Sequence, residues 1–191
     1  MKSPTSNKDE FFPGNYYHVY NRAHGSERLF FKNANYEYFL RKYRYFFSDY
    51  LKTYAYCLMP NHFHLLVKAN GGFDDTDKVI CEQFRKFFIG YAQAINIQED
   101  RMGGLFMRPF KRKMIADKNH LAVIVNYIHR NPVHHGLCKN PSAHVWNSYH
   151  HLVMKKSERQ GLNILSPLEL EETLMIKDFQ LNDEIKDLLL D

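Results

Sequence analysis

Two histidines one residue apart, His62 and His64, are the residues of this sequence best suited to chemistry. They stand in the segment YCLMPNHFHLLV, directly after a Met-Pro-Asn turn and at the start of an apolar run. Side chains alternate between the two faces of a strand, so both imidazoles project from one face, roughly 6.5–7 Å apart. Phe63, Leu65 and Val67 make the other face apolar. Two imidazoles held in this way can bind one metal ion, and ordinary strand histidines are the alternative that the spacing leaves open.

A second pair of reactive side chains, Tyr127 and Asn131, stands four residues apart on a predicted helix. The apolar residues between Leu121 and Ile128 cluster on one side of that helix, and the pair stacks along the flank of this apolar side. An amide oxygen is a ligand that Mg²⁺ accepts, and a phenol can attack phosphorus as a nucleophile. With 13 tyrosines in the chain, a packed tyrosine with a wet hydroxyl is the alternative for Tyr127.

Alternating strands and helices are predicted to position these residues. Apolar periodicity indicates strands over 15–22, 53–59, 62–69 and 105–116 and helices over 33–50, 78–96 and 118–131. Pro60 and Asn61 form the tight turn of a hairpin, and Pro109 confines part of the fourth strand to an edge or a bulge. Pro132 is expected to stop the third helix. The order predicts an α+β fold, an antiparallel sheet with helices packed on one face.

Composition points to an ordinary globular protein. Hydrophobic residues make up 45% and charged residues 25% of the 191 residues, and no apolar run is long enough to span a bilayer. The polar N-terminus lacks the apolar core of a signal peptide, so we expect a cytoplasmic protein without a membrane partner. Cys57, Cys81 and Cys138 are odd in number and far apart, which argues against a disulfide framework or a cysteine zinc site.

The charge is unevenly distributed along the chain. From Gly161 to Asp191 there are 8 acidic and 2 basic residues, which leaves 24 basic against 13 acidic residues in the first 160. A basic body with an acidic tail is typical of nucleic-acid-binding proteins, with a simply basic soluble protein as the alternative. Basic side chains near Phe106 and Phe110 can follow phosphates while rings stack on bases, although core packing is the slightly better interpretation of the two rings. The residues predicted to contact DNA are Arg22, Arg85, Lys86, Arg108, Lys111, Arg112, Lys113 and Arg130.

The motifs resemble a known family. MPNHFHLLV resembles the His-hydrophobic-His motif of the HUH single-tyrosine transposases, especially the REP-associated tyrosine transposase group. Four further segments resemble that group in the expected order: YHVYNRAHGSERLFF its first strand and turn, GLFMRPFKRKMI its basic segment, YIHRNPVHHGLCKNP its tyrosine helix and exit loop, and WNSYHH its Trp-Ser-Ser-Tyr signature. The resemblance covers about residues 15–150. It is broken at residues 107–109, Met-Arg-Pro, where relatives often have Gln-Gly-Arg.

The resemblance implies a ferredoxin-like catalytic domain, which we expect over residues 1–154. The composition of residues 155–191 predicts a linker followed by an acidic helical tail. It implies metal-dependent cleavage and rejoining of single-stranded DNA near hairpins, through a covalent 5′-phosphotyrosine. Carried over by position, His62 and His64 are metal ligands, Asn131 is the third ligand and Tyr127 is the nucleophile. The implied metal is Mg²⁺ or Mn²⁺, and the implied partner is single-stranded or hairpin DNA.

Several alternatives remain open at this point. A domesticated hairpin-DNA-binding protein with little or no cleavage activity is one, and a metal-dependent hydrolase without a covalent step is another. Tyr91, on the second predicted helix, is a second candidate nucleophile. A homodimer can pair the tyrosine of one chain with the histidines of the other, whereas some members of the group act as monomers.

Overall fold

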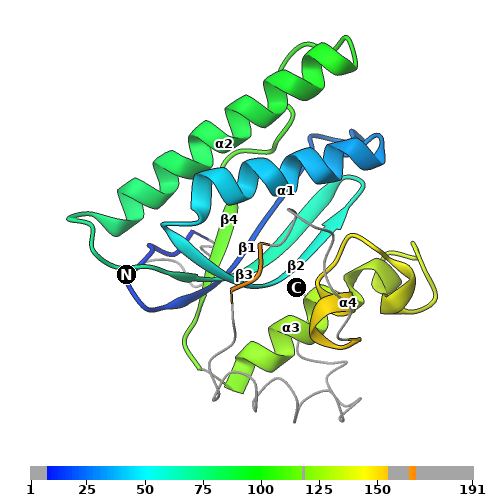
Figure 1. The fold of residues 1–191 in the computed structure, drawn as a ribbon. Coiled ribbons are helices and arrows are strands. Elements are labelled where there is room, and N and C mark those ends of the chain that lie inside the picture. The colour runs from blue at the N-terminus through cyan, green and yellow to red at the C-terminus, as the bar shows by residue number, and fades with distance from the viewer. Residues whose placement is uncertain (1–7, 118, 155–163, 167–191) are drawn as a thin grey trace.

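A four-stranded sheet with helices on both sides forms the body of the protein (Figure 1). The computed structural model describes residues 8–117, 119–154 and 164–166. The strands are β1 (Tyr16–Arg22), β2 (Leu51–Met59), β3 (His62–Ala69) and β4 (Lys111–Ile115). The helices are α1 (Asn33–Phe47), α2 (Thr76–Gln98), α3 (Asn119–His134) and α4 (Tyr149–Leu152), with a short 3-10 turn, η1 (Pro141–Ala143). Within these described ranges, no helix has the length and apolar composition needed to cross a bilayer.

The sheet has the ferredoxin-like strand order β2-β3-β1-β4, and every pairing in it is antiparallel. The strands β1 and β3 occupy the centre, where hydrogen bonds on both sides fix their position. The register places Tyr20 of β1 between His64 of β3 and Lys111 of β4. The predicted α+β class and antiparallel sheet are therefore confirmed, and the histidine pair lies on a central strand.

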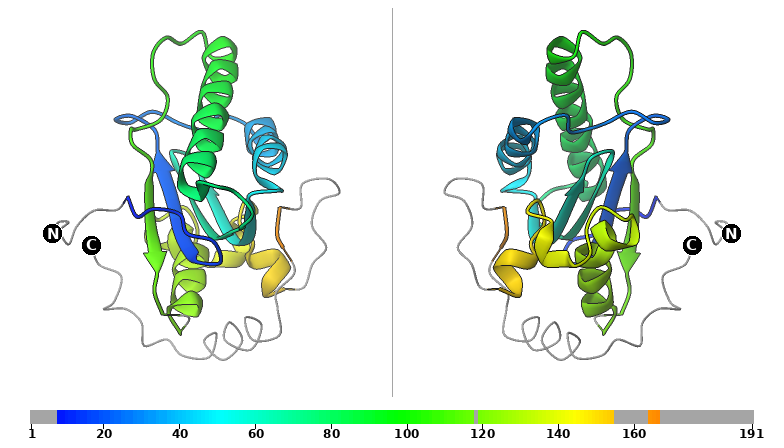
Figure 2. Two further views of the ribbon diagram at one scale, coloured as in Figure 1. Left: turned by 90° about the vertical axis from the view of Figure 1, so that its left-hand side faces the viewer. Right: turned by 90° about the vertical axis from the view of Figure 1, so that its right-hand side faces the viewer.

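The helices occupy both faces of the sheet, not the single face that the sequence pattern predicted for all of them (Figure 2). The helices α1 and α2 cover one face, where Phe63, Leu65 and Val67 join an aromatic core. The helix α3 covers the opposite face, where Leu66 and Tyr54 form a second core. The alternation of β3 suggested one apolar face, but β2 is buried on both faces, so a second layer is needed to keep its outer face from water.

The helix α3 extends past Pro132 to His134, so the predicted stop at this proline was wrong. A proline in the last turn removes one backbone hydrogen bond, and the turn is closed by others. Gly136, at φ 67°, adopts the left-handed conformation, and its backbone N–H donates to Val133 O over 3.0 Å. The backbone N–H of Leu137 donates to Pro132 O over 2.8 Å. This pair of bonds is the Schellman arrangement, and it keeps Asn131 inside regular helix.

The fourth strand is shorter than predicted, because β4 begins at Lys111. The preceding segment 105–110 follows the end of β1 only loosely: Phe106 bridges to Ala23, and the backbone N–H of Met107 donates to Arg22 O over 2.9 Å. The expected linker and acidic tail lie outside the described residues, apart from 164–166, which contact β2. There the backbone N–H of Ser166 donates to the carbonyl of a β2 residue, Thr53, over 2.7 Å.

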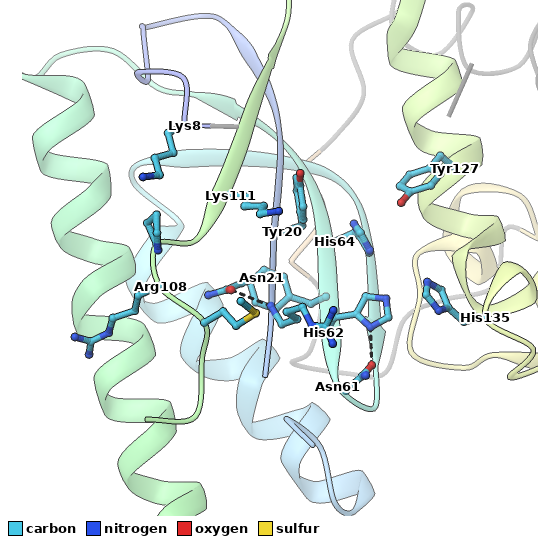
Figure 3. Close-up of a pocket in the computed structure, with 14 residues that line it drawn as sticks. Lys8, Tyr20, Asn21, Asn61, His62, His64, Arg108, Lys111, Tyr127 and His135 are labelled. Carbon is cyan, nitrogen blue, oxygen red and sulfur yellow. Dashed lines mark hydrogen bonds between the residues drawn. The ribbon is translucent and has the colours of Figure 1, made fainter. Parts of the chain in front are cut away.

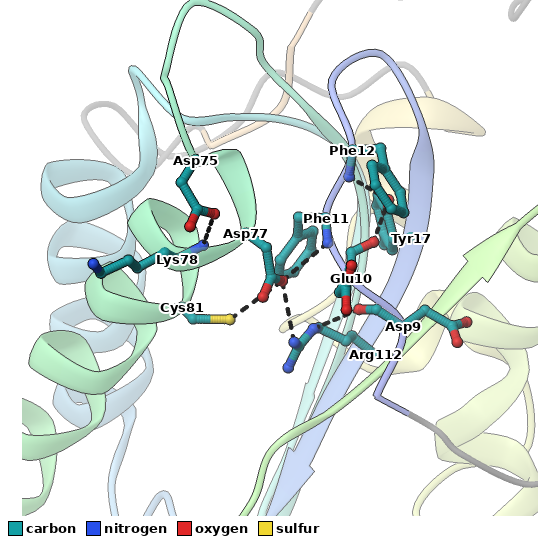
Figure 4. Close-up of polar contacts among 10 residues, drawn as sticks. All are labelled: Asp9, Glu10, Phe11, Phe12, Tyr17, Asp75, Asp77, Lys78, Cys81 and Arg112. Atoms are coloured by element: carbon teal, nitrogen blue, oxygen red, sulfur yellow. Dashed lines mark hydrogen bonds and ion pairs between the residues drawn. The ribbon is translucent and has the colours of Figure 1, made fainter. Parts of the chain in front are cut away.

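A polar cluster attaches residues 8–12 to β4 and α2 (Figure 4). The Arg112 guanidinium donates to Asp77 Oδ1 over 3.1 Å and to the carbonyl oxygen of Asp9 over 2.6 Å. The same Asp77 oxygen accepts the backbone N–H of Phe11 over 3.0 Å. The guanidinium also lies over the rings of Phe11 and Phe110, at 5.2 and 5.1 Å from their centroids. Arg112 is thus held between three parts of the chain and is largely removed from solvent.

We predict that Arg112→Met will lower the free energy of unfolding by about 2–3 kcal/mol, because it leaves Asp77 without its cation in a partly buried site. Chemical denaturation followed by circular dichroism measures this loss. Arg85→Met is the matched control, since Arg85 pairs with Glu82 on the exposed side of α2 and its loss should change stability little. Equal losses in the two variants would show that the Arg112 cluster has no special structural role.

Candidate active site

The two histidines of β3 project together into one cavity of about 850 Å³ (Figure 3). Their ring centroids lie 5.3 Å apart, with the ring planes at 86° to each other. His64 is buried and His62 is half-buried. Phe63, between them, points into the core under α1 and α2, as the strand alternation predicted. Four cationic residues also line the cavity: Lys8, Arg22, Arg108 and Lys111.

The helix α3 brings Tyr127 to the same cavity. Leu121, Val125 and Ile128 pack into the core beneath the helix, which turns its flank toward β3. The Tyr127 ring lies edge-on to His64, with a centroid distance of 5.5 Å, and Figure 3 shows its hydroxyl directed toward the histidines. The residues that the sequence pattern assigned to a nucleophile and a metal therefore meet within a single chain.

The alternative nucleophile, Tyr91, lies on the other side of the sheet. It is fully buried in the core of α1 and α2, and its hydroxyl donates to the carbonyl oxygen of Leu29 over 2.8 Å. Burial raises the pKa of this phenol well above its usual value, which opposes its ionisation. Tyr91 is therefore separated from the histidine cavity by the sheet. A different tyrosine, Tyr20, does line the cavity and stacks on His64 at 5.6 Å between centroids.

His64 has a buried histidine partner on the neighbouring strand. Its Nδ1 lies 2.9 Å from Nε2 of His18, and the two rings stack with 5.1 Å between centroids. Burial, with a smaller effect of Lys113, lowers the pKa of His18 to about 3, and burial also lowers the pKa of His64 well below its usual value. Both rings are neutral at pH 7, so one donates and the other accepts. If His64 donates through Nδ1, its Nε2 keeps a lone pair for a metal ion.

The surroundings of His62 fit a bound cation. Its Nδ1 lies 2.6 Å from the Asn61 side-chain oxygen, and its Nε2 lies 3.4 Å from the Asn131 side-chain oxygen. Burial lowers the pKa of His62 to about 4, so the neutral ring has one N–H for two oxygens. If the proton is on Nδ1, which makes the shorter contact with Asn61, then His62 Nε2 and the Asn131 oxygen are two acceptors that face each other. Two ligands of one small cation, with bonds of about 2.1 Å, have a similar separation of roughly 3.0–3.4 Å.

The ligand set that this geometry offers is two imidazoles and one amide oxygen. Within the described ranges of the chain, no group of three histidine, cysteine, aspartate or glutamate side chains is arranged to hold a metal ion. Asn131 is buried, and α3 fixes it one turn beyond Tyr127. Imidazole and amide ligands without a carboxylate leave the charge of a divalent cation largely uncompensated, so an anionic group in the cavity would be favoured.

The predicted DNA contacts divide into four groups. Arg22, Arg108 and Lys111 line the cavity, and Lys113 lies on the same face of β4 as Lys111, opposite His18 in the register. Arg85 and Lys86 lie on α2, on the other side of the sheet, near Glu82. Arg112 points away from the cavity into its cluster with Asp77. Arg130 is half-buried on α3.

Sequence reasoning missed four residues around the site: Lys8, His18, Tyr20 and Asn61. His18 and Tyr20 alternate with Tyr17 and Val19 along β1 and share a face, so the first strand carried a usable signal. Their position beside His64 depends on strand register, which one sequence does not reveal. Lys8 carried no periodic signal, because it enters the cavity through an isolated bridge to β4.

A metal ion at His64 Nε2 requires His64 to donate through Nδ1 to His18, so we predict that metal-free protein will show His64 protonated at Nδ1 and not at Nε2. Long-range ¹H–¹⁵N correlation spectra of the histidine rings measure this directly. The low pKa values predict that His18 and His62 stay neutral as the pH falls from 8 to about 5, well below the usual titration near 6.5. His18→Phe, which removes the acceptor, should raise the Nε2–H form of His64. An Nε2–H form of His64 in the unmodified protein would contradict this assignment.

Comparison with known proteins identifies similar chains. No family model matches this sequence. A protein of Haemophilus influenzae, named "Putative REP-associated tyrosine transposase", is 29% identical over 113 residues, which cover 52% of this chain and 59% of that relative. A solved structure of a REP-associated tyrosine transposase bound to a REP hairpin superimposes with a TM-score of 0.64 at 17% identity, over 88% of this chain and 93% of that chain.

The two comparisons agree with the motifs. The sequence match spans less than two thirds of the relative, whereas the fold match spans nearly the whole of the solved chain. The resemblance inferred from the sequence is therefore confirmed: this chain is similar to the REP-associated tyrosine transposases in part of its sequence and in its fold.

Proposed function

We propose that this protein is a metal-dependent endonuclease and strand transferase that cuts and rejoins single-stranded DNA beside hairpins. The observation that carries the proposal is the meeting of Tyr127, from α3, with His62 and His64, from β3, in one cavity lined by cations. A nucleophile, a place for a divalent ion and a basic surface are the parts that phosphoryl transfer requires.

The similar proteins support DNA with a hairpin as the substrate. The sequence relative is named a tyrosine transposase, and the structural neighbour is bound to a hairpin. The cavity in this chain has the charge that such a ligand requires, since Lys8, Arg22, Arg108 and Lys111 all line it. Phosphates attract cations regardless of sequence, so these side chains would hold and orient the DNA backbone.

Cleavage would proceed by attack of the Tyr127 phenolic oxygen on a phosphate. A bond forms between this oxygen and phosphorus as the bond to the 3′ oxygen breaks, which leaves the 5′ side attached to the protein. The phenol releases its proton, and the departing 3′ oxygen takes one up, so that a 3′-hydroxyl is formed. The reverse reaction with another 3′-hydroxyl rejoins the DNA, because the phosphotyrosine conserves the energy of the cleaved bond.

His62, His64 and Asn131 are the residues that would hold the divalent ion, Mg²⁺ or Mn²⁺. When bound, the ion would supply charge stabilisation at the phosphate oxygens. His18 and Asn61 would not bind the ion. Their hydrogen bonds to His64 and His62 would fix which nitrogen of each imidazole carries the proton. One chain supplies every residue named here, so the proposal does not depend on a homodimer.

We predict that Tyr127→Phe will abolish the covalent protein–DNA adduct and keep hairpin binding within about twofold, because only the nucleophilic oxygen is lost. The assay uses a labelled single-stranded hairpin with Mn²⁺, followed by denaturing gel electrophoresis. Tyr91→Phe and Tyr20→Phe are the matched controls, one on the far side of the sheet and one inside the cavity.

Each other outcome of this assay indicates either a different nucleophile or a different function. An adduct that persists in Tyr127→Phe and is lost in Tyr20→Phe would move the nucleophile to β1. Cleavage without an adduct would indicate a hydrolase, and tight hairpin binding without cleavage in the unmodified protein would indicate a DNA-binding protein that does not cut.

We further predict that saturating Mn²⁺ will raise the melting temperature by several degrees. A free Mn²⁺ concentration about 100-fold above the dissociation constant raises the free energy of unfolding by about 2.7 kcal/mol. Differential scanning fluorimetry measures the shift. His62→Phe and Asn131→Leu should each remove most of it. His135→Phe should keep it, because His135 contacts the His62 ring, at 4.8 Å between centroids, without belonging to the ligand set. A shift that survives both ligand variants would place the metal elsewhere.

A further inference from the structure

A second cavity, of about 750 Å³, lies between α2 and the segment 103–110. It is next to the cavity that contains His62, His64 and Tyr127, which is called the catalytic cavity below. Its wall on α2 includes Phe88, Ile89 and Ala92, and its other wall includes Phe106 and Phe110. Ile89 and Phe110 are only half-buried, so the cavity keeps apolar surface accessible to a ligand. We name this space, bounded by α2 and residues 103–110, the α2 groove.

The α2 groove adjoins the catalytic cavity. Four of the described residues line both spaces and so form the boundary between them: Lys8, Met107, Arg108 and Pro109. Figure 3 shows Arg108 extending from this boundary toward α2, away from the histidines. The two cations at the boundary are therefore available to a chain of phosphates that passes from one space to the other.

The chemistry of the α2 groove fits an unpaired nucleobase. The half-buried side chains of Phe88, Ile89 and Phe110 offer a stacking surface, as in other single-strand-binding sites. The cations Lys8 and Arg108 lie along its margin, and Arg85 lies beside them in an ion pair with Glu82. Gln93, exposed at the rim, places an amide beside that surface. An apolar peptide would also fit the surface, but a peptide gives no reason for Lys8 and Arg108 at the margin.

On this basis, we propose that the single-stranded DNA joined to the hairpin leaves the catalytic cavity across residues 107–109 and places one base in the α2 groove. The inference rests on the proposed function for the identity of the strand. It also gives a role to Arg85, a predicted DNA contact that lies on the far side of the sheet from the histidines. The ligand class is an unpaired nucleotide, held by stacking and by its phosphate.

The test compares a hairpin alone with the same hairpin carrying single-stranded extensions, on either side, with one abasic position moved along them. Fluorescence anisotropy measures the dissociation constants at fixed salt. We expect the intact extension on one side to tighten binding by roughly 5- to 150-fold, which is the gain that one stacked base supplies. One abasic position should remove that gain.

Two variants on α2 provide the matched comparison. Ile89→Glu introduces a negative charge into the α2 groove, and Ile97→Glu introduces the same charge at a side chain that is 84% exposed and lines neither cavity. Ile89→Glu should lose the gain from the extension while keeping its affinity for the bare hairpin and its Tyr127 adduct. Ile97→Glu should keep all three.

The results separate this inference from the proposed function. Equal gains in Ile89→Glu and Ile97→Glu would overturn the α2 groove as a base site, as would a gain that no abasic position reduces or the absence of any gain. Absence of the adduct in the unmodified protein, with the base-dependent gain retained, would overturn the cleavage chemistry and leave the α2 groove supported.

Discussion

The packing of α3 against the sheet face that carries the histidines is the interaction on which the site depends. Leu121, Val125 and Ile128 are buried against that face, and their burial sets the rotation of the helix. Because Tyr127 and Asn131 stand on the flank of this apolar stripe, the same packing turns both toward β3. The Schellman turn beyond Pro132 keeps the last residues helical, so Asn131 stays one turn from Tyr127.

Burial beneath α3 also determines the chemical state of the imidazoles. A charged imidazole is costly away from water, so His18, His62 and His64 all have lowered pKa values and are neutral at pH 7. A neutral imidazole is the form that binds metals, and each candidate ligand has a partner for its other nitrogen, at 2.9 Å for His64 and 2.6 Å for His62. The fold thus supplies lone pairs in one cavity and cations around it, an arrangement that suits an anionic substrate with a divalent ion.

Local patterns predicted much of this arrangement. Strand alternation correctly placed both histidines on one face and Phe63 on the other, and helical spacing correctly placed Tyr127 and Asn131 together. The side of the sheet occupied by α3 could not be predicted, because β2 is apolar on both faces and so accepts a layer on either. In the sequence, nothing distinguishes Arg112 from its basic neighbours, because its ion pair with Asp77 joins two segments that are distant in the chain. Contacts between distant segments, such as that of Lys8 with the cavity, leave no periodic signal in one sequence.

The central claim is that one cation is held by His62, His64 and Asn131 beside the Tyr127 oxygen. Anomalous diffraction from crystals soaked in Mn²⁺ tests it most directly, because the signal locates the metal without reference to any assay. We expect an anomalous peak bonded to both imidazoles and to the Asn131 oxygen, in the same cavity as the Tyr127 hydroxyl. A peak bonded to other side chains, or a well-occupied site separated from Tyr127 by the sheet, would contradict the claim.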